Sequence, residues 1–316
     1  MKYYIGIDLG GTNTVAGIVD ESMQIIAKSK MKTRIPRPAA EICRDIAELC
    51  LELTGMHNIS MSDITWLGIG SPGVVWENVV CYASNLEFVN APIAALLEEQ
   101  LHRPVYAEND ANAAAYAEYI AGAGRGCTSM AAITIGTGIG SGIIFGNSIH
   151  TGFNGAAAEL GHTIVEYGGL SCACGKRGCL EMYCSATGLI RMTVEAMNAC
   201  PDSLMWSICG EAGRPDGRTA FEAMKRGDAS GGKVVDKFIG YLAAGVSNVI
   251  NLFQPQLVCI GGGVSGEGDA LLLPLREKVS RMVFSGKNAE TTQIKIAELG
   301  NDAGVIGAAM LGKAEH

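Results

Sequence analysis

The residues best suited to chemistry lie between positions 159 and 181. This segment reads E-L-G-H at 159–162 and C-A-C-G-K-R-G-C-L-E at 172–181, so one histidine and three cysteines fall within eighteen residues. One imidazole and three thiolates form a complete ligand set for a tetrahedral structural zinc. His162 alone would read as a core histidine, but the neighbouring cysteines favour metal ligation. The predicted ligands are His162, Cys172, Cys174 and Cys179.

Two glutamates flank this cluster. A Cys3His set leaves no open coordination position, so Glu159 and Glu181 are not needed as metal ligands and are available to bind another group. A carboxylate accepts hydrogen bonds from two neighbouring hydroxyl groups, which is one way to hold a polyol. The alternative is that both are ordinary solvated glutamates. Gly175 and Gly178 would let the loop turn tightly around an ion and keep the two glutamates close together.

Three glycine-rich loops follow expected strands and predict phosphate binding. They read D-L-G-G-T-N at 8–13, G-T-G-I-G at 136–140 and G-G-G-V at 261–264. Glycines let backbone N–H groups approach an anion closely. One such loop would be read as a turn, but three favour a triphosphate held from opposite domains. None has the Walker A pattern, and strand residues after Gly140 argue against a dinucleotide-binding turn. The candidates are Gly10, Gly11, Thr12, Asn13, Thr137, Gly138, Gly262 and Gly263.

Two aspartates stand at expected strand ends. Asp8 is placed to hold a hydrated Mg²⁺ near the phosphates. Asp110, in E-N-D at 108–110, could accept the proton of an attacking hydroxyl, or it could simply cap the helix that follows. Both interpretations hold together if Asn109 caps the helix while Asp110 faces the substrate. Asn109 would then also bind substrate hydroxyls.

The elements that must position these residues alternate between strands and helices. Strands are expected at 3–8, 14–20, 66–69, 105–107, 131–135, 141–145 and 257–260, and helices at 39–54, 93–101, 111–121, 232–253 and 304–312. The strand–glycine loop–strand unit at the N-terminus returns about 128 residues later, which predicts two halves of related architecture. We therefore expect two α/β domains, 1–121 and 122–301, with a joint at 122–126 and a C-terminal helix, 302–316, that joins the first domain.

Composition excludes several classes of protein. The net charge of −8 argues against nucleic acid as a partner, and no apolar run is long enough for a membrane span. The chain starts directly with an expected strand, so we expect no signal peptide. Outside the 172–179 cluster the cysteines are scattered in apolar contexts, as in a reducing compartment, so we expect a cytoplasmic protein. A disulfide within the cluster is the weaker alternative.

These motifs together resemble the ROK family of bacterial sugar kinases and regulators. The resemblance spans the chain and rests also on G-S-P-G at 70–73, E-N-D-A-N-A-A at 108–114 and I-N-L-F-Q-P at 250–255. It implies an actin-like, ribonuclease-H-like fold of two domains, with ATP and sugar in the interdomain cleft, a structural zinc and a base at Asp110. Sugar contacts carry over to Gly73, Asn85, Asn109, Asp110, Glu159, His162 and Glu181. His162 would bind zinc through one nitrogen and sugar through the other. The family also implies a homodimer or homotetramer.

Regulators of this family carry a DNA-binding segment before the first strand, whereas seven residues precede Asp8 here. We therefore expect an enzyme, an ATP-dependent kinase of the 6-hydroxyl of a hexose. The stretch 217–228 resembles glucokinases of Gram-positive type, which favours glucose. The alternatives are a kinase of allose, fructose, mannose or N-acetylmannosamine, a non-catalytic sugar sensor, and a zinc-stabilised scaffold whose glycine loops are only turns.

Overall fold

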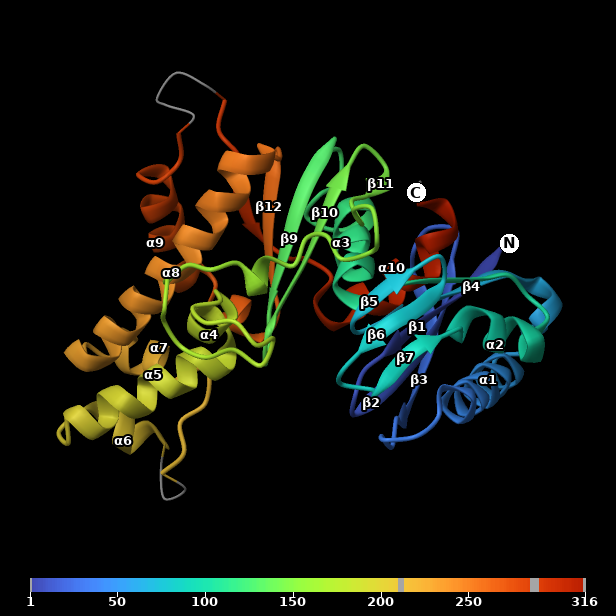
Figure 1. Cartoon of the computed structure of the whole chain (residues 1–316), viewed down its shortest axis with the longest axis horizontal. Coiled ribbons are helices and arrows are strands. Elements are labelled where there is room, and N and C mark those ends of the chain that lie inside the picture. Colours follow the sequence, from blue (N-terminus) through green and yellow to red (C-terminus); the bar gives the residue numbers. More distant parts are fainter. Residues whose placement is uncertain (1, 210–212, 285–289, 315–316) are drawn as a thin grey trace. The chain divides into compact units, whose positions relative to one another are not determined.

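The computed structural model describes residues 2–209, 213–284 and 290–314 (Figure 1). The chain forms two compact units. The first comprises Met1–Thr128, Gly142–Ala158 and Glu298–His316, and the second comprises Ser129–Ser141 and Glu159–Ala297. Residues 315–316, the end of the predicted C-terminal helix, lie outside the described residues.

A five-stranded sheet organises the first unit. Its strand order is β3-β2-β1-β4-β8. The strands are β1 (Tyr3–Leu9), β2 (Asn13–Asp20), β3 (Ile25–Lys32), β4 (Ile64–Ser71) and β8 (Val105–Asn109). β1 and β2 form the predicted antiparallel hairpin, and β4 and β8 continue the sheet in parallel. The parallel register places Asp8 beside Gly70 and Gly70 beside Glu108, so these strands end at one edge of the sheet.

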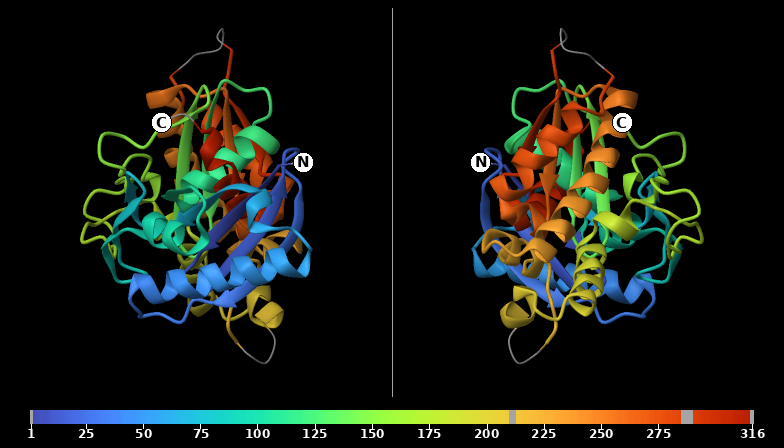
Figure 2. Two further views of the ribbon diagram at one scale, coloured as in Figure 1. Left: turned by 90° about the vertical axis from the view of Figure 1, so that its right-hand side faces the viewer. Right: turned by 90° about the vertical axis from the view of Figure 1, so that its left-hand side faces the viewer.

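Helices cover both faces of this sheet. α1 (Ala39–Met56) and α2 (Ile93–Leu101) pack against each other, and Figure 2 shows α1, in light blue, along one face. α3 (Asp110–Ala121) and α10 (Ala303–Met310) pack together against β1 and β4. The predicted last helix therefore ends at Met310, and a 3₁₀ turn, η6 (Leu311–Lys313), follows. A small antiparallel sheet of β5 (Val74–Trp76), β6 (Val79–Ala83) and β7 (Phe88–Ala91) completes the unit.

The second sheet repeats the topology of the first. Its order is β11-β10-β9-β12-β13, with β9, β12 and β13 parallel. The strands are β9 (Ser129–Ile135), β10 (Ile139–Phe145), β11 (Ser148–Ile149), β12 (Leu257–Gly261) and β13 (Gln293–Ile296). Each sheet thus places its third, second, first, fourth and fifth strands in that order, which confirms the predicted relation between the two halves.

The helices of the second unit lie between its strands in sequence. They are α4 (Glu181–Cys184), α5 (Ala186–Ala199), α6 (Leu204–Cys209), α7 (Thr219–Lys225), α8 (Ala229–Phe253) and α9 (Asp269–Ser280). α8 packs against α4, α5, α7 and α9, and its inward face is apolar along most of its length. Asp228 caps α8 by accepting from the N–H of Gly231 at 2.6 Å, so the helix begins three residues before the predicted position.

The segment Gly142–Ala158 belongs to the first unit, although the sequence assigned it to the second domain. Long-range contacts decide this. The hydroxyl of Tyr116 in α3 hydrogen-bonds Asn147 Oδ1 at 3.0 Å, and Asn147 Nδ2 donates to the Lys313 carbonyl at 2.8 Å. Gly155 lies against the carbonyl of Val75, where an added Cβ would be 2.2 Å from the oxygen. No pattern in the local sequence predicts such contacts between distant segments. Among the described helices, none is both long and apolar enough to cross a membrane.

We expect Gly307→Ala to lower the free energy of unfolding by about 3 kcal/mol. α10 meets its neighbours backbone to backbone, and a Cβ at Gly307 would lie 1.8 Å from the Ala113 carbonyl oxygen of α3. A Cβ added at Gly240, in the middle of α8, would meet no atom within 4 Å. Gly240→Ala should therefore raise the free energy of unfolding by about 0.5–1 kcal/mol. Urea unfolding of both variants measures the difference. Equal effects would show that α10 is not packed as described.

Candidate functional site

The first unit brings Asp8 and Asp110 together at the carboxyl edge of its sheet. Asp8 lies near the end of β1, and Asp110 is the first residue of α3, directly after β8. Gly70 of β4, which pairs with Asp8, lies close to the backbone of Asp110, where an added Cβ would be 3.3 Å from Asp110 Cα. The two carboxylates interact electrostatically. The edge therefore holds two negative charges side by side, an arrangement suited to a divalent cation and a proton acceptor.

The helix cap is supplied by Asn109. Its Oδ1 accepts from the N–H groups of Ala111 at 2.9 Å and Asn112 at 3.1 Å. Its Nδ2 donates to the Gly73 carbonyl at 3.0 Å, which uses one of the two N–H bonds of this amide. Asp110 accepts from the Ala111 N–H at 2.8 Å. The predicted cap at Asn109 is confirmed, and the role of Asp110 toward a substrate stays a prediction.

The loop after β1 is tightly held. The N–H of Gly10 donates to the Asn13 carbonyl at 3.0 Å, and the Gly10 carbonyl accepts from the buried Thr33 hydroxyl at 2.6 Å. Thr33 in turn accepts from Thr14 at 3.0 Å. The Gly10 N–H is thus used within the turn, while Thr12 and Asn13 are exposed at the tip. Gly11 lies near Asn85, which is itself exposed. The two residues belong to different segments, and sequence spacing alone did not relate them.

Burial, together with the charge of Asp110, raises the pKa of Asp8 to about 6. Burial also raises the pKa of Asp110, against hydrogen bonds from backbone N–H groups that lower it. The folded protein therefore binds a proton at Asp8 more tightly than the unfolded chain, whose aspartate pKa is about 3.9. The free energy of unfolding consequently falls as pH rises from about 4 to about 6 and stays low above that range.

We expect Asp8→Asn to be more stable than the native protein by up to about 3 kcal/mol at pH 8 without magnesium, because about two pKa units of charge burial are removed. At pH 3.5 both proteins carry a neutral side chain here, and the difference should vanish. Urea unfolding at the two pH values measures it, with exposed Asp202→Asn as the control. A stability difference independent of pH would contradict the prediction.

The second unit brings the four predicted metal ligands together. The ligand atoms of His162, Cys172, Cys174 and Cys179 all lie within 4.8 Å of one another. His162 Nδ1 is 3.7 Å from Cys172 Sγ, and Cys174 Sγ is 3.6 Å from Cys179 Sγ. A tetrahedron with Zn–S bonds of about 2.3 Å has edges of about 3.8 Å, so the set fits zinc. The 3.6 Å separation excludes a Cys174–Cys179 disulfide.

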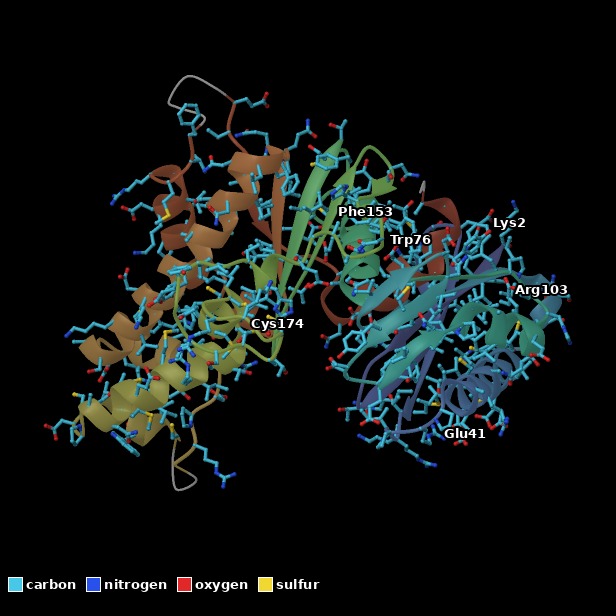
Figure 3. All side chains as sticks on the ribbon, in the orientation of Figure 1. Lys2, Glu41, Trp76, Arg103, Phe153 and Cys174 are labelled. Carbon is cyan, nitrogen blue, oxygen red and sulfur yellow. The ribbon has the colours of Figure 1, made fainter. Side chains whose placement is uncertain are left out.

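The loop that carries the cluster depends on its glycines. Gly175 and Gly178 have φ of 86° and 83°, as their predicted role in the turn requires. A Cβ at Gly178 would lie 1.7 Å from the Glu166 carbonyl oxygen. The loop is also fixed from below, because the Tyr183 hydroxyl accepts from the Leu170 N–H at 2.8 Å. Figure 3 labels Cys174, the exposed ligand of the four, on this loop.

Glu181 connects this loop to the glycine loop at 136–140. Its Oε2 accepts from the Ile139 N–H at 2.9 Å and lies against Gly138, where an added Cβ would be 2.3 Å away. One carboxylate oxygen of Glu181 is thus engaged with the backbone of the glycine loop. Glu159 is exposed at the start of η2 (Leu160–His162). Because Nδ1 of His162 faces the cysteines, Nε2 lies on the opposite side of the ring.

The two glycine loops of the second unit lie next to each other. Gly262, with φ of 84°, packs on the end of β9, where an added Cβ would be 2.4 Å from the Ile135 carbonyl oxygen. Beside Gly263 an open pocket of about 420 Å³ is lined by charged residues: Arg218, Glu222, Lys225, Arg226 and Glu267. Lys225 pairs with Glu267 at 2.6 Å. These residues were not predicted as a site, although the three cations within 218–226 were an available signal in the sequence.

Residues 4–315 match the ROK family. The chain belongs to this family. Its actin-like fold accounts for the two sheets of equal strand order.

Two curated relatives illustrate how far the similarity extends. The glucokinase of Halalkalibacterium halodurans is 36% identical over 318 residues, which cover 100% of this chain and 96% of that protein. The glucokinase of Thermotoga maritima is 37% identical over 310 residues, which cover 97% and 96%. The crystal structure of a ROK family glucokinase from Streptomyces griseus, in complex with glucose and AMPPNP, has a TM-score of 0.83 at 36% identity and covers 98% of each chain. The ROK fold of this chain is therefore matched along its whole length.

Proposed function

We propose that this ROK protein is an ATP-dependent sugar kinase that transfers the γ-phosphoryl group to the 6-hydroxyl of a hexose, with glucose as the leading substrate. The observation that carries the proposal is the pair of carboxylates, Asp8 and Asp110, at one edge of the first sheet beside a glycine loop. Glucokinase relatives at 36–37% identity, and a related structure that holds glucose and AMPPNP, support the choice of substrates.

In this proposal Asp110 is the general base. It accepts the proton of the 6-hydroxyl as the new O–P bond forms and the bond to ADP breaks. A carboxylate with a raised pKa is a better proton acceptor than an ordinary aspartate. Phosphoryl transfer otherwise needs alignment and charge stabilisation from the protein. Asp8 would hold a hydrated Mg²⁺, which supplies positive charge beside the phosphates.

The glycine loops would bind the triphosphate through backbone N–H groups, with the hydroxyls of Thr12 and Thr137 as further donors. Both threonines are exposed at their loops. The pocket beside Gly263 would receive the adenosine part of ATP, which is uncharged, because two of its cations, Lys225 and Arg226, are already paired with Glu267 and Glu222. This part of the proposal requires the two units to act on the same ATP molecule.

Ring hydroxyls would be held by the residues around the metal cluster. We assign this role to Nε2 of His162, to Glu159 and to the second oxygen of Glu181, together with Gly73, Asn85 and the second N–H of Asn109. A zinc ion on the Cys3His set would order the loop between His162 and Glu181 and would take no part in the chemistry. In this proposal the metal stabilises the loop that carries the sugar-binding residues.

A coupled assay of ADP release tests the function. Glucose, allose, fructose, mannose and N-acetylmannosamine are each supplied with ATP and Mg²⁺. We expect the highest kcat/KM with glucose. Highest activity with another hexose would support the proposed kinase activity and would identify that hexose as the substrate in place of glucose. Sugar binding in calorimetry with no ADP release from any hexose would instead identify a non-catalytic sugar sensor. If neither nucleotide nor sugar raised the thermal stability of the protein, the remaining alternative would be a zinc-stabilised scaffold that binds neither ligand.

A further inference from the structure

Glu118 is a buried carboxylate in the last turn of α3 that has no part in the proposed binding of ATP or sugar. Its side chain is 3% exposed. Oε2 accepts from the N–H groups of Ala123 at 3.0 Å and Glu298 at 3.1 Å, and Oε1 accepts from that of Leu299 at 2.7 Å. A buried charge is costly unless it is hydrogen-bonded, and three bonds to an ionised acceptor meet that need. The backbone carbonyl of Glu118 also accepts from Gly122 and Gly124.

These amides belong to two segments that cross between the compact units. The chain leaves the first unit after Thr128, five residues beyond Ala123, and returns to it at Glu298. One carboxylate therefore fixes the first-unit ends of two of the four crossings. The two segments are 175 residues apart in sequence, counted from Ala123 to Glu298, and no other local pattern in either segment predicts their meeting.

The same carboxylate is connected to both proposed active-site aspartates. Asp110 is the first residue of α3, the helix that carries Glu118. Leu299 precedes α10, whose Gly304 lies against Asp8, because an added Cβ there would be 2.7 Å from Asp8 Oδ2. Ala117 of α3 packs in one buried cluster with Ala303 and Ile306 of α10. Displacement of either crossing segment would therefore reach the helix that positions Asp110 and the helix that supports Asp8.

We propose that Glu118 is a positioning residue that anchors both crossing segments to α3, and so keeps Asp110 of α3 aligned with Asp8, which α10 supports. The inference rests on the proposed kinase activity and adds to it a residue that positions the base. Small displacements of a catalytic group can lower turnover strongly even when the change lies away from the reacting atoms.

Glu118→Gln tests the anchor with little change of volume. A carboxamide has one oxygen, so its NH₂ group must face at least one of the three N–H donors and leave it unpaired. We expect kcat to fall by about 10- to 100-fold, as for a base displaced by a fraction of an ångström to one ångström. The dissociation constant of glucose, measured by calorimetry, should change by less than about threefold. A lower unfolding midpoint with unchanged kcat at 25 °C would overturn the proposal, because it would make Glu118 purely structural.

Arg125→Ala is the matched control. Arg125 Nη2 pairs with Glu298 Oε2 at 3.2 Å and joins the same two segments, but the side chains are 65% and 52% exposed. Exposed ion pairs contribute little, so kcat should stay within about twofold of the native value. A loss as large as that of Glu118→Gln would mean that any link between the segments suffices, which would also overturn the special role of Glu118.

Hydrogen exchange of the native protein provides a test that requires no variant to fold. The N–H groups of Ala123, Glu298 and Leu299 should exchange at least about 100-fold more slowly than exposed loop amides, with and without glucose. Fast exchange at these three amides in either state would overturn the anchor. Absence of kinase activity in the native protein would contradict the proposed function. The exchange rates of the three amides would still decide separately whether Glu118 anchors the two segments.

Discussion

Asp110→Asn is expected to lower kcat by about 10²- to 10⁴-fold while the protein stays folded and still binds sugar. The amide keeps the shape of the side chain but cannot accept the hydroxyl proton. The fold should persist because Asn109, and not Asp110, supplies the cap of α3 through two backbone N–H groups. Steady-state kinetics with glucose and ATP, together with calorimetric titration of glucose, measure the two effects.

The control for this prediction is Asn109→Ala, which removes the cap and leaves Asp110 in place. It should lower the unfolding free energy by about 1 kcal/mol, and it also removes one proposed contact to the sugar. Loss of the folded state in Asp110→Asn, with a normal fold in Asn109→Ala, would reverse the roles that we assign to the two residues.

Cys174→Ser is expected to remove zinc and to weaken glucose binding by at least about tenfold. The loss of one ligand opens the Cys3His set, and the loop that carries it leads within seven residues to Glu181. Glu181 in turn holds the Ile139 N–H, so disorder in the zinc loop should reach the neighbouring glycine loop. Metal content by mass spectrometry and glucose titration test the coupling.

Cys200→Ser serves as the comparison, because Cys200 lies in the same unit and outside the metal cluster. It should keep about one zinc per chain and the native affinity for glucose. A Cys174→Ser protein that lacks zinc but binds glucose normally would show that the metal does not brace the sugar site.

Local sequence patterns predicted the parts of the structure that depend on neighbouring residues. The β1–β2 hairpin follows from two strands around a glycine turn, and the start of α3 follows from the cap at Asn109. β3 and β5–β7 were not predicted. β3 reads I-I-A-K-S-K-M-K, in which half of the residues are polar and only one position is buried, so its apolar signal is weak. β5–β7 are three to five residues long, too short for a periodic signal.

Other features depend on contacts between distant segments. The assignment of Gly142–Ala158 to the first unit rests on contacts of Asn147 and Gly155. The two hydrogen-bond partners of Asn147 lie 31 and 166 residues away in the sequence. The engagement of Glu181 with Ile139 spans 42 residues. A sequence pattern reports only residues close along the chain, so it identified Glu181 as available but not what it binds in the folded unit.

The amino-acid sequence by itself determined the chemistry that this protein carries: the four-ligand metal set, the glycine loops after strands and the carboxylates at strand ends. These are short-range features, because a ligand loop, a turn or a cap requires particular residues at particular spacings. Only the tertiary structure decided which of these groups meet. Asp8 and Asp110 share one edge because β1, β4 and β8 pair in parallel, and the three N–H groups at Glu118 converge because α3 and α10 pack together. Burial at those meeting points then changes what the groups can do, as the raised pKa of Asp8 illustrates.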